Sequence, residues 1–296
     1  MRRSLPRWLS VVAASVLSGA LASMLQVPLV QAQESARSGS HHRAVQLNQD
    51  DSAADATPDD IWAWRETWTG SEKSGNTLSV YTGATMAVGG SILNENGWRL
   101  RSLSGHGRSQ YPGVKWIGGH AYPVTVHAQN NFSDLLAGYQ WGSATRFGHL
   151  TVKAFGGLAI ESQRASPSNA IAARSLRYGA KGAVETWLDI SDRTWLSVDA
   201  SIGSARRAFA GRARYGWRII PGLSIGPEAG VGGNEGDGAG RAGAFARFEW
   251  GAGDWWSGEV SAAAGMSTNT ISMNNIGSAP LSRGDPYANI SLLLRY

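Results

Sequence analysis

Apolar and polar residues alternate with a period of two in segment after segment of this chain, from Asn76 to Tyr296. The last segment, 288–296, shows the pattern most clearly. Ala, Ile, Leu, Leu and Tyr occupy one set of alternate positions, and Asn, Ser, Leu and Arg occupy the other. Successive side chains of a β-strand point to opposite faces of the sheet, so this alternation predicts strands with one apolar face. We therefore expect an all-β chain.

We predict about twelve such strands, within a range of about 10 to 14, forming an antiparallel up-and-down β-barrel. The alternating segments are 76–88, 98–108, 114–129, 134–141, 150–161, 176–190, 196–202, 209–219, 223–231, 244–250, 256–266 and 288–296. Most approach the ~9–11 residues that a tilted strand needs to cross a bilayer. The third segment is the least regular, because Pro123 interrupts it and proline cannot donate to a ladder.

The connections between these segments alternate in length. The short ones are 142–147, 191–194, 221–222 and 251–254, and the longer ones are 162–175, 232–240 and 267–285. Outer-membrane barrels have short turns on the periplasmic side and longer loops outside the cell. The same arrangement is expected here.

Alternation alone also fits a water-soluble calycin-type barrel, which holds apolar side chains inside and polar ones outside. Composition favours the membrane version, in which the apolar face meets lipid. The polar face is rich in Gly, Ala and Ser, the Trp and Tyr residues gather near segment ends, and the last residue is the aromatic Tyr296. Aromatic residues at strand ends are typical of a lipid–water interface. The sequence thus predicts a transmembrane barrel over residues 66–296.

The N-terminal segment has the pattern of a secretory signal peptide. Three arginines precede an apolar run that begins at Trp8, and small residues lead to Ala32. We expect a cleaved signal peptide over 1–32, with an uncleaved anchor as the alternative. Residues 33–65 are polar and rich in Asp, Ser and Ala, so they cannot bury enough apolar surface to order themselves. A disordered lead-in is expected there.

Charge and cysteine content exclude several classes of function. The net charge of +5 falls on cleavage, because three arginines leave with the signal peptide and Lys plus Arg drops from 27 to 24 against 22 Asp plus Glu, giving +2. So small a charge indicates no nucleic-acid partner. The chain has no cysteine, which excludes a disulfide framework, a thiolate metal site and a Cys nucleophile.

Catalytic motifs are absent from the sequence. The six histidines include no metal-binding spacing such as H-E-x-x-H. A hydrolase of the outer-membrane kind would need His106 or His127 beside Ser133 and Asp134 at one rim. The glycine-rich segment 230–240 lacks the Lys-Ser/Thr ending of a phosphate loop. We expect no catalytic residue, no metal and no cofactor.

The polar face carries the candidate functional residues. They are Lys153, Arg177, Lys181, Glu185, Trp187, Asp199, Arg212, Arg214, Arg218, Glu228, Arg247 and Glu249. In a membrane barrel these side chains line the lumen. They either form a paired ladder that fills a narrow pore, or they offer a hydrophilic path with candidate glycan contacts, since charged groups hydrogen-bond hydroxyls and Trp187 can stack on a sugar.

The order of short motifs along the chain resembles a known family. The motifs are Trp68-Thr69-Gly70, Tyr81-x-Gly83, Gly97-Trp98-Arg99-Leu100-Arg101 before Gly105-x-Gly107, Asp134-Leu135-Leu136-Ala137-Gly138-Tyr139-Gln140-Trp141, Glu185-Thr186-Trp187, Gly226-Pro227-Glu228, Arg241-Ala242-Gly243-Ala244-Phe245 and Pro286-Tyr287-Ala288. In this order they resemble the cellulose biosynthesis protein BcsS family over residues 65–296. The resemblance implies a secreted outer-membrane β-barrel associated with bacterial cellulose synthase systems, and it brings no catalytic residues.

Together these observations predict a non-catalytic barrel in the outer membrane that assists cellulose biosynthesis, through β-glucan export or surface assembly. The expected partners are outer-membrane lipid, cellulose or another β-glucan, components of the cellulose synthase system, and the barrel-assembly machinery. The last is expected because the terminal strand ending at Tyr296 resembles the C-terminal strand of bacterial outer-membrane barrels. The alternatives are a general porin-like channel, a structural or adhesive barrel with a filled lumen, and a lipid-modifying enzyme.

Overall fold

The computed structural model describes residues 63–166, 174–234, 237–252, 256–270 and 284–296. The expected signal peptide over 1–32, and the expected lead-in up to residue 62, lie outside the described residues. Within the described part there is no helix with the length and apolar character needed to cross a membrane.

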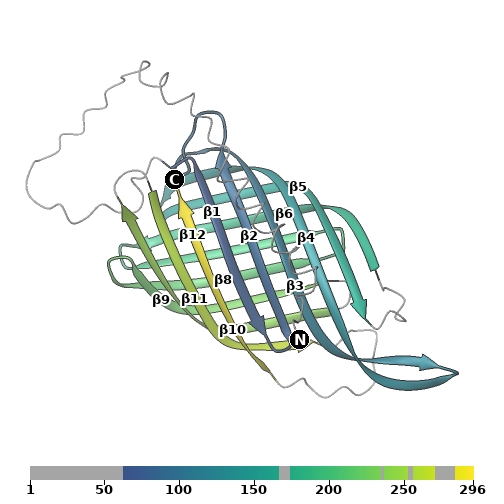
Figure 1. Ribbon diagram of the computed structural model, residues 1–296. Coiled ribbons are helices and arrows are strands. Elements are labelled where there is room, and N and C mark those ends of the chain that lie inside the picture. Colours follow the sequence, from purple (N-terminus) through teal and green to yellow (C-terminus); the bar gives the residue numbers. More distant parts are fainter. Residues whose placement is uncertain (1–62, 167–173, 235–236, 253–255, 271–283) are drawn as a thin grey trace, which may run out of the picture. The chain divides into compact units, whose positions relative to one another are not determined.

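Twelve antiparallel strands form one closed barrel, as the alternation predicted. The strands are β1 (Arg65–Ser74), β2 (Thr77–Ala87), β3 (Gly97–Ile117), β4 (His120–Thr145), β5 (Gly148–Ser166), β6 (Arg174–Ser191), β7 (Thr194–Gly203), β8 (Phe209–Ile220), β9 (Leu223–Asn234), β10 (Asp237–Ala252), β11 (Trp256–Thr270) and β12 (Asp285–Arg295). Each strand pairs with its neighbours in sequence. The ladder between β1 and β12, from Glu66↔Arg295 to Ser74↔Tyr287, closes the ring (Figure 1).

The predicted number of strands is confirmed, but one strand was not predicted and one predicted segment is wrong. β1 escaped the prediction because its outward positions are Thr67, Thr69 and Ser71, which are not apolar. The segment 114–129 is not a separate strand, since a turn at Gly118 and Gly119 divides it between β3 and β4. Both glycines have positive φ, +57° and +83°, which a two-residue hairpin turn of type I′ requires.

The two rims of the barrel differ. At the terminal rim, where β1 begins and β12 ends, the connections are 88–96, 146–147, 192–193, 221–222 and 253–255. At the opposite rim, which we call the hairpin rim, they are 75–76, 118–119, 167–173, 204–208, 235–236 and 271–284. The long connections 167–173 and 271–284 are thus on the side predicted for them, but the long connection predicted at 232–240 is wrong, because β9 and β10 leave only 235–236 between them. The connection 88–96 is an exception, being long on the terminal rim.

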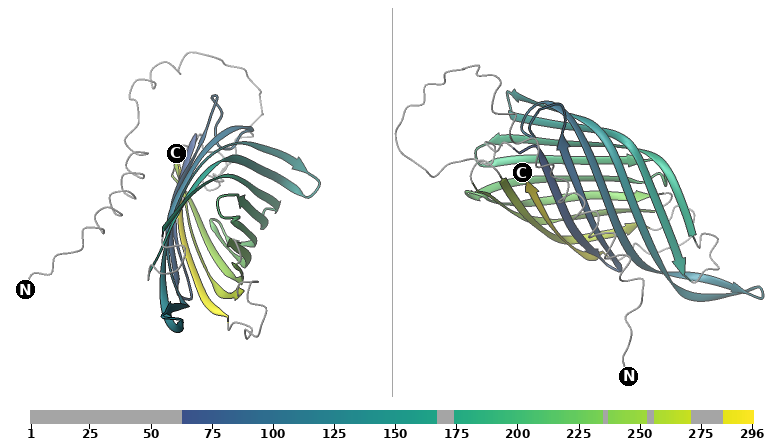
Figure 2. Two further views of the ribbon diagram at one scale, coloured as in Figure 1. Left: turned by 90° about the vertical axis from the view of Figure 1, so that its right-hand side faces the viewer. Right: turned by 45° about the horizontal axis from the view of Figure 1, so that its top comes forward.

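The hairpin of β3 and β4 projects beyond the other strands at the hairpin rim (Figures 1 and 2). The β2–β3 ladder ends at Thr77↔Ser109, and the β4–β5 ladder ends at His127↔Ser166. Residues 110–126 therefore form a two-stranded ribbon whose strand edges lack neighbours among the described strands. Such an edge can pair with another chain, and a lone ribbon is only marginally stable in water.

The polar faces of the strands point into the barrel. Lys153 on β5 contacts Glu66 on β1, although these strands are not neighbours in the ring. Side chains on the convex outer wall diverge, so strands that are not adjacent can meet in this way only across the lumen. The apolar residues of the other face are exposed, Leu158 at 69% and Ile202 at 70%. This arrangement excludes the water-soluble barrel and leaves an apolar outer belt.

The close packing of Trp195 against Gly216 inside the barrel can be tested by mutation. A Cβ atom at Gly216 of β8 would lie 2.2 Å from the Trp195 indole, so the bare backbone is what admits this ring. Gly216→Ala should push Trp195 away and destabilise the barrel by about 1–3 kcal/mol, the usual cost of overpacking. The measurement is the urea midpoint of the purified barrel, followed by heat-modifiable gel migration.

Gly211→Ala is the matched control on the same strand. Its Cβ would face outward and meet only Val231 at 3.4 Å and a backbone oxygen at 3.8 Å. A midpoint for Gly216→Ala equal to that of the control would contradict the inward position of Trp195.

Candidate functional site: the lumen of the barrel

Ion pairs between strands that are not adjacent cross the lumen on the β3–β6 side. The Arg101 guanidinium on β3 donates two hydrogen bonds to the Glu185 carboxylate on β6, one of them 2.7 Å long. Lys181 on β6 contacts Asp134 on β4 at 2.5 Å. Glu66, which is 5% exposed, lies 3.5 Å from the Lys153 ammonium. Each bridge ties together two strands that have no ladder between them.

A second group of charges lies between β8, β9, β10 and β12. Arg214 donates to Glu228 at 2.5 Å and to the Ser261 hydroxyl at 3.2 Å. The Tyr287 hydroxyl donates to the other Glu228 oxygen at 3.3 Å, and Arg241 approaches that oxygen at 3.7 Å. Glu228 is 3% exposed and Arg214 6% exposed. A buried carboxylate is tolerated because several donors satisfy it.

Aromatic rings fill the lumen next to these charges. Trp187 and Trp195 stack with ring centroids 4.2 Å apart, and Phe245 lies 5.3 Å from Trp195. Trp195 has no exposed surface, and its indole N–H donates to the Ser224 hydroxyl at 3.1 Å. The Arg247 guanidinium lies 4.5 Å from the Trp187 ring centroid.

Arg247 also binds two carboxylates. Its guanidinium donates to Glu249 at 2.6 Å and to Glu259 at 2.8 Å. A single cation thus holds together two like charges, which would otherwise repel each other. The contacts of Arg247 with Trp187 and Trp195 join the charged groups to the aromatic ones.

The connection 88–96 folds into the terminal rim. Arg99 donates to the backbone oxygens of Ile92 at 2.9 Å and Glu95 at 2.5 Å, and it is 1% exposed. Gln140 donates to the Leu93 oxygen at 2.6 Å. Because Arg99 and Gln140 lie on the lumen face of β3 and β4, the segment packs on the lumen side of these two strands at this end.

The predicted lumen residues lie among these contacts as follows. Asp199 pairs with Arg212 at 2.7 Å, and Arg218 pairs with Asp189 at 2.5 Å. The interactions given above involve Lys153, Lys181, Glu185, Trp187, Arg214, Glu228, Arg247 and Glu249. Arg177 lies at the hairpin rim, exposed and opposite Glu161 in the ladder. Their role as glycan contacts stays a prediction.

Several residues of the same network were not among the candidates. They are Glu66, Glu72, Arg99, Arg101, Asp134, Arg241, Glu259, Trp195 and Tyr287. Arg101, Asp134 and Glu259 occupy the polar alternate positions of their strands, which face the lumen. Taking every charged residue at such positions would have included them. Glu66 and Glu72 were missed along with β1. Trp195 was missed because the predicted segment began at Leu196, whereas β7 begins at Thr194.

The residues of the candidate hydrolase set do not come together. His106 contacts Asn131 at 2.8 Å, and Ser133 contacts Ser104 at 3.0 Å, both on exposed outer positions. Asp134 faces the lumen and pairs with Lys181. The barrel wall lies between the outward-facing His106 and the lumen-facing Asp134, so no His–Asp pair can form there. Among the described residues, no cluster of His, Asp or Glu is able to hold a metal ion.

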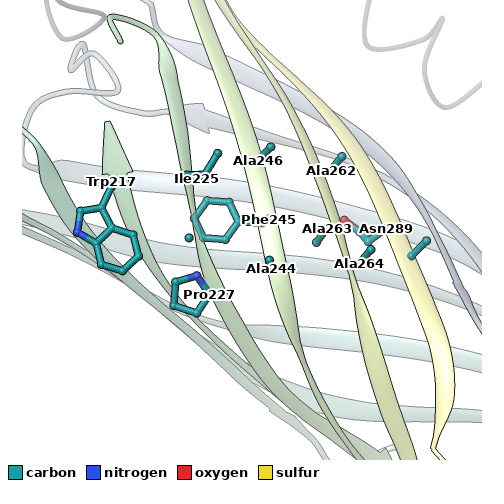
Figure 3. A pocket seen from close by; sticks show the side chains of 12 residues that line it. Trp217, Ile225, Pro227, Ala244, Phe245, Ala246, Ala262, Ala263, Ala264 and Asn289 are labelled. Atoms are coloured by element: carbon teal, nitrogen blue, oxygen red, sulfur yellow. The ribbon is translucent and has the colours of Figure 1, made fainter. Parts of the chain in front are cut away.

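Hollows occur both in the barrel wall and at one rim. One is a shallow concavity of about 700 Å³ in the barrel wall, with small residues such as Pro227, Ala244 and Ala264 at its surface (Figure 3). The other is a polar cavity of about 220 Å³ at the hairpin rim. It is lined by side chains from β4 to β9, with Asn130, Phe132 and Lys181 among them.

Residues 67–292 match the family described as cellulose biosynthesis protein BcsS. The chain belongs to this family. The match spans most of the barrel, from β1 to β12, as the order of motifs predicted. None of the curated proteins matches the chain.

Solved structures with a similar fold are outer-membrane proteins of low sequence identity. The KdgM porin in complex with disordered oligogalacturonate is 9% identical, with a TM-score of 0.42. The match covers 78% of this chain and 99% of that chain. The transport unit of the autotransporter AIDA-I from Escherichia coli is 10% identical, with a TM-score of 0.46 and coverages of 85% and 94%. Outer membrane phospholipase A from Escherichia coli is 8% identical, with a TM-score of 0.38 and coverages of 82% and 94%. Similarity this low says nothing about function.

The buried ion pairs predict a difference between two arginines of β8. Arg214→Met leaves Glu228 buried with Arg241 at 3.7 Å as its nearest cation, which should cost about 3–5 kcal/mol of stability. Arg212→Met removes a partly exposed pair with Asp199 and should cost at most about 1 kcal/mol. Urea unfolding of both variants in the same detergent measures the difference. Equal midpoints would show that the Arg214 pair is hydrated rather than buried.

Proposed function

We propose that this barrel sits in the outer membrane and assists the assembly of cellulose at the cell surface, without catalysis and without passing the glucan chain through its lumen. The observation that carries the proposal is that ion pairs and aromatic rings meet across the lumen of a barrel that belongs to a cellulose biosynthesis family. The family match supports the process, and the side chains that meet across the lumen favour a role at the barrel surface over export through it.

A passing glucan chain needs a continuous hydrated path. Here Trp195, Phe245 and Arg247 meet in the interior, and Arg99 fixes the segment 88–96 at the terminal rim. Opening a path would separate buried ion pairs, and breaking one such pair costs several kcal/mol. The lumen is therefore better suited to holding the barrel wall rigid than to conduction.

The exposed belt and the two rims support the placement in the membrane. Leu158 is 69% exposed, and Tyr178 and Ile202 are each 70% exposed, which is costly in water but favourable in lipid. The terminal rim, with both ends of the barrel, would then face the periplasm, and the hairpin rim would face outward from the cell.

The expected partners follow from this placement. The cellulose synthase system and its β-glucan would be met at the rims, and the outer belt would meet lipid. The barrel-assembly machinery would recognise the terminal strand, whose last residue Tyr296 pairs through its backbone with Arg65 at 3.0 Å and 2.9 Å.

A structural or adhesive barrel is the second candidate, and the projecting ribbon favours it. Tyr111, Val114, Ile117 and Tyr122 are between 44% and 60% exposed on the segment 110–126. Exposed apolar residues on a ribbon with unpaired edges mark a surface for contact with another molecule. A porin-like channel has less support because the lumen is filled, and a lipid-modifying enzyme has less because its candidate residues are split between two faces.

Deletion of the gene tests the proposed process. Cells without the barrel should make extracellular cellulose in reduced amount or with altered fibre form, because assembly at the surface is impaired. Extracellular cellulose is weighed and its fibres are viewed by electron microscopy, with the wild-type gene returned as the control. Cellulose unchanged in both amount and form would refute the role.

A further inference from the structure

The polar cavity at the hairpin rim has a definite place in the barrel. It lies between β4 and β9, on the rim side of the Lys181–Asp134 pair. Its volume of about 220 Å³ equals roughly seven water molecules at ~30 Å³ each. Pockets for drug-sized ligands hold about 300–1,000 Å³, so this one suits a group as small as one sugar ring.

The cavity offers hydrogen-bonding groups that no described residue engages. Asn130 on β4, Gln163 on β5 and Asn234 on β9 line it with side-chain amides. Within the described part of the chain, these three amides have no hydrogen-bond partner. Each amide can both donate and accept, as each sugar hydroxyl can, so three amides around one cavity match a polyhydroxylated ligand.

The charges that line the cavity are already paired. Glu161 lies 3.5 Å from Arg206, and Lys181 lies 2.5 Å from Asp134. Arg177, opposite Glu161 in the β5–β6 ladder, is not among the lining residues. No lining charge therefore awaits a counter-ion, and a neutral ligand fits better than an acidic one.

An apolar surface completes the cavity and continues out of it. The half-buried Phe132 ring is part of the lining and offers a face for the C–H side of a sugar. Tyr122 and Tyr111 lie on the same face of the hairpin, since Tyr122 and Phe132 are both on even positions of β4 and Tyr111 pairs with Val126. At ~3.4 Å per residue, Tyr122 lies about 27 Å from Asn130 along β4.

We infer that this cavity is a binding site for one ring of a neutral β-glucan chain, with the rest of the chain directed along the lumen-side face of the projecting hairpin. The inference rests on the proposed role in cellulose assembly, which it deepens by assigning a ligand class and a site. The filled lumen below the cavity means that the chain is held at the mouth and does not enter further.

The test uses the full barrel purified in detergent, with cellotetraose as the probe and isothermal titration as the readout. The double variant Asn130→Ala/Gln163→Ala should bind at least about tenfold more weakly than wild type, because two hydrogen-bonding groups are lost. Gln129→Ala is the matched control, as it removes the neighbouring amide on the opposite face of β4 and should bind like wild type. Heat-modifiable migration confirms that each variant is folded.

The outcomes are separable from those of the proposed function. Equal affinity of the double variant and the control, or no binding by wild type, overturns the site. Tighter binding of an acidic oligogalacturonate than of cellotetraose overturns the neutral ligand class. If deletion leaves cellulose unchanged while wild type binds cellotetraose and the double variant does not, the site stands and the proposed process fails.

Discussion

The closing ladder between β1 and β12 is the constraint on which the rest of the structure depends. A bilayer offers no water to satisfy backbone N–H and C=O groups, so a sheet can cross it only when no edge is left open. Here the last residue completes the ring: the Tyr296 N–H donates to the Arg65 oxygen at 2.9 Å, and the Arg65 N–H donates to the Tyr296 oxygen at 3.0 Å. Closure of the ring gives each strand a lumen face and an outer face. The contacts described above depend on that separation.

The inside of this ring is narrow enough for side chains to meet across it. Long charged and aromatic side chains then replace the water that a wider barrel would hold. The Arg101–Glu185 pair links two strands that share no ladder, and the Arg214–Glu228 pair reinforces the ladder between β8 and β9. Trp195 packs against Phe245 in the same interior. The lumen thus acts as the core of the protein, a polar one, while the apolar residues face outward. At the hairpin rim the lining includes, besides ion pairs, the side-chain amides of Asn130 and Gln163, which have no hydrogen-bond partner among the described residues.

Much of this could be predicted from the sequence, because a period of two is a local property. The alternation of Leu292 and its neighbours, or of Val198 with Asp199, directly assigns the two faces of a strand. β1 could not be found in this way, since its outer face carries Thr and Ser. The pairing partners could not be predicted either. That Arg101 meets Glu185, which is 84 residues distant in sequence, depends on strand tilt and ring closure, and neither leaves a local pattern.

The claim that the lumen is filled can be tested most directly by single-channel conductance in a planar lipid bilayer. The account predicts that the wild-type barrel conducts little or no current, and that Trp195→Ala combined with Arg247→Ala raises the conductance by removing the side chains that meet in the interior. A large, steady wild-type conductance that added cello-oligosaccharide blocks would contradict the account, because it would show an open path wide enough for a glucan chain.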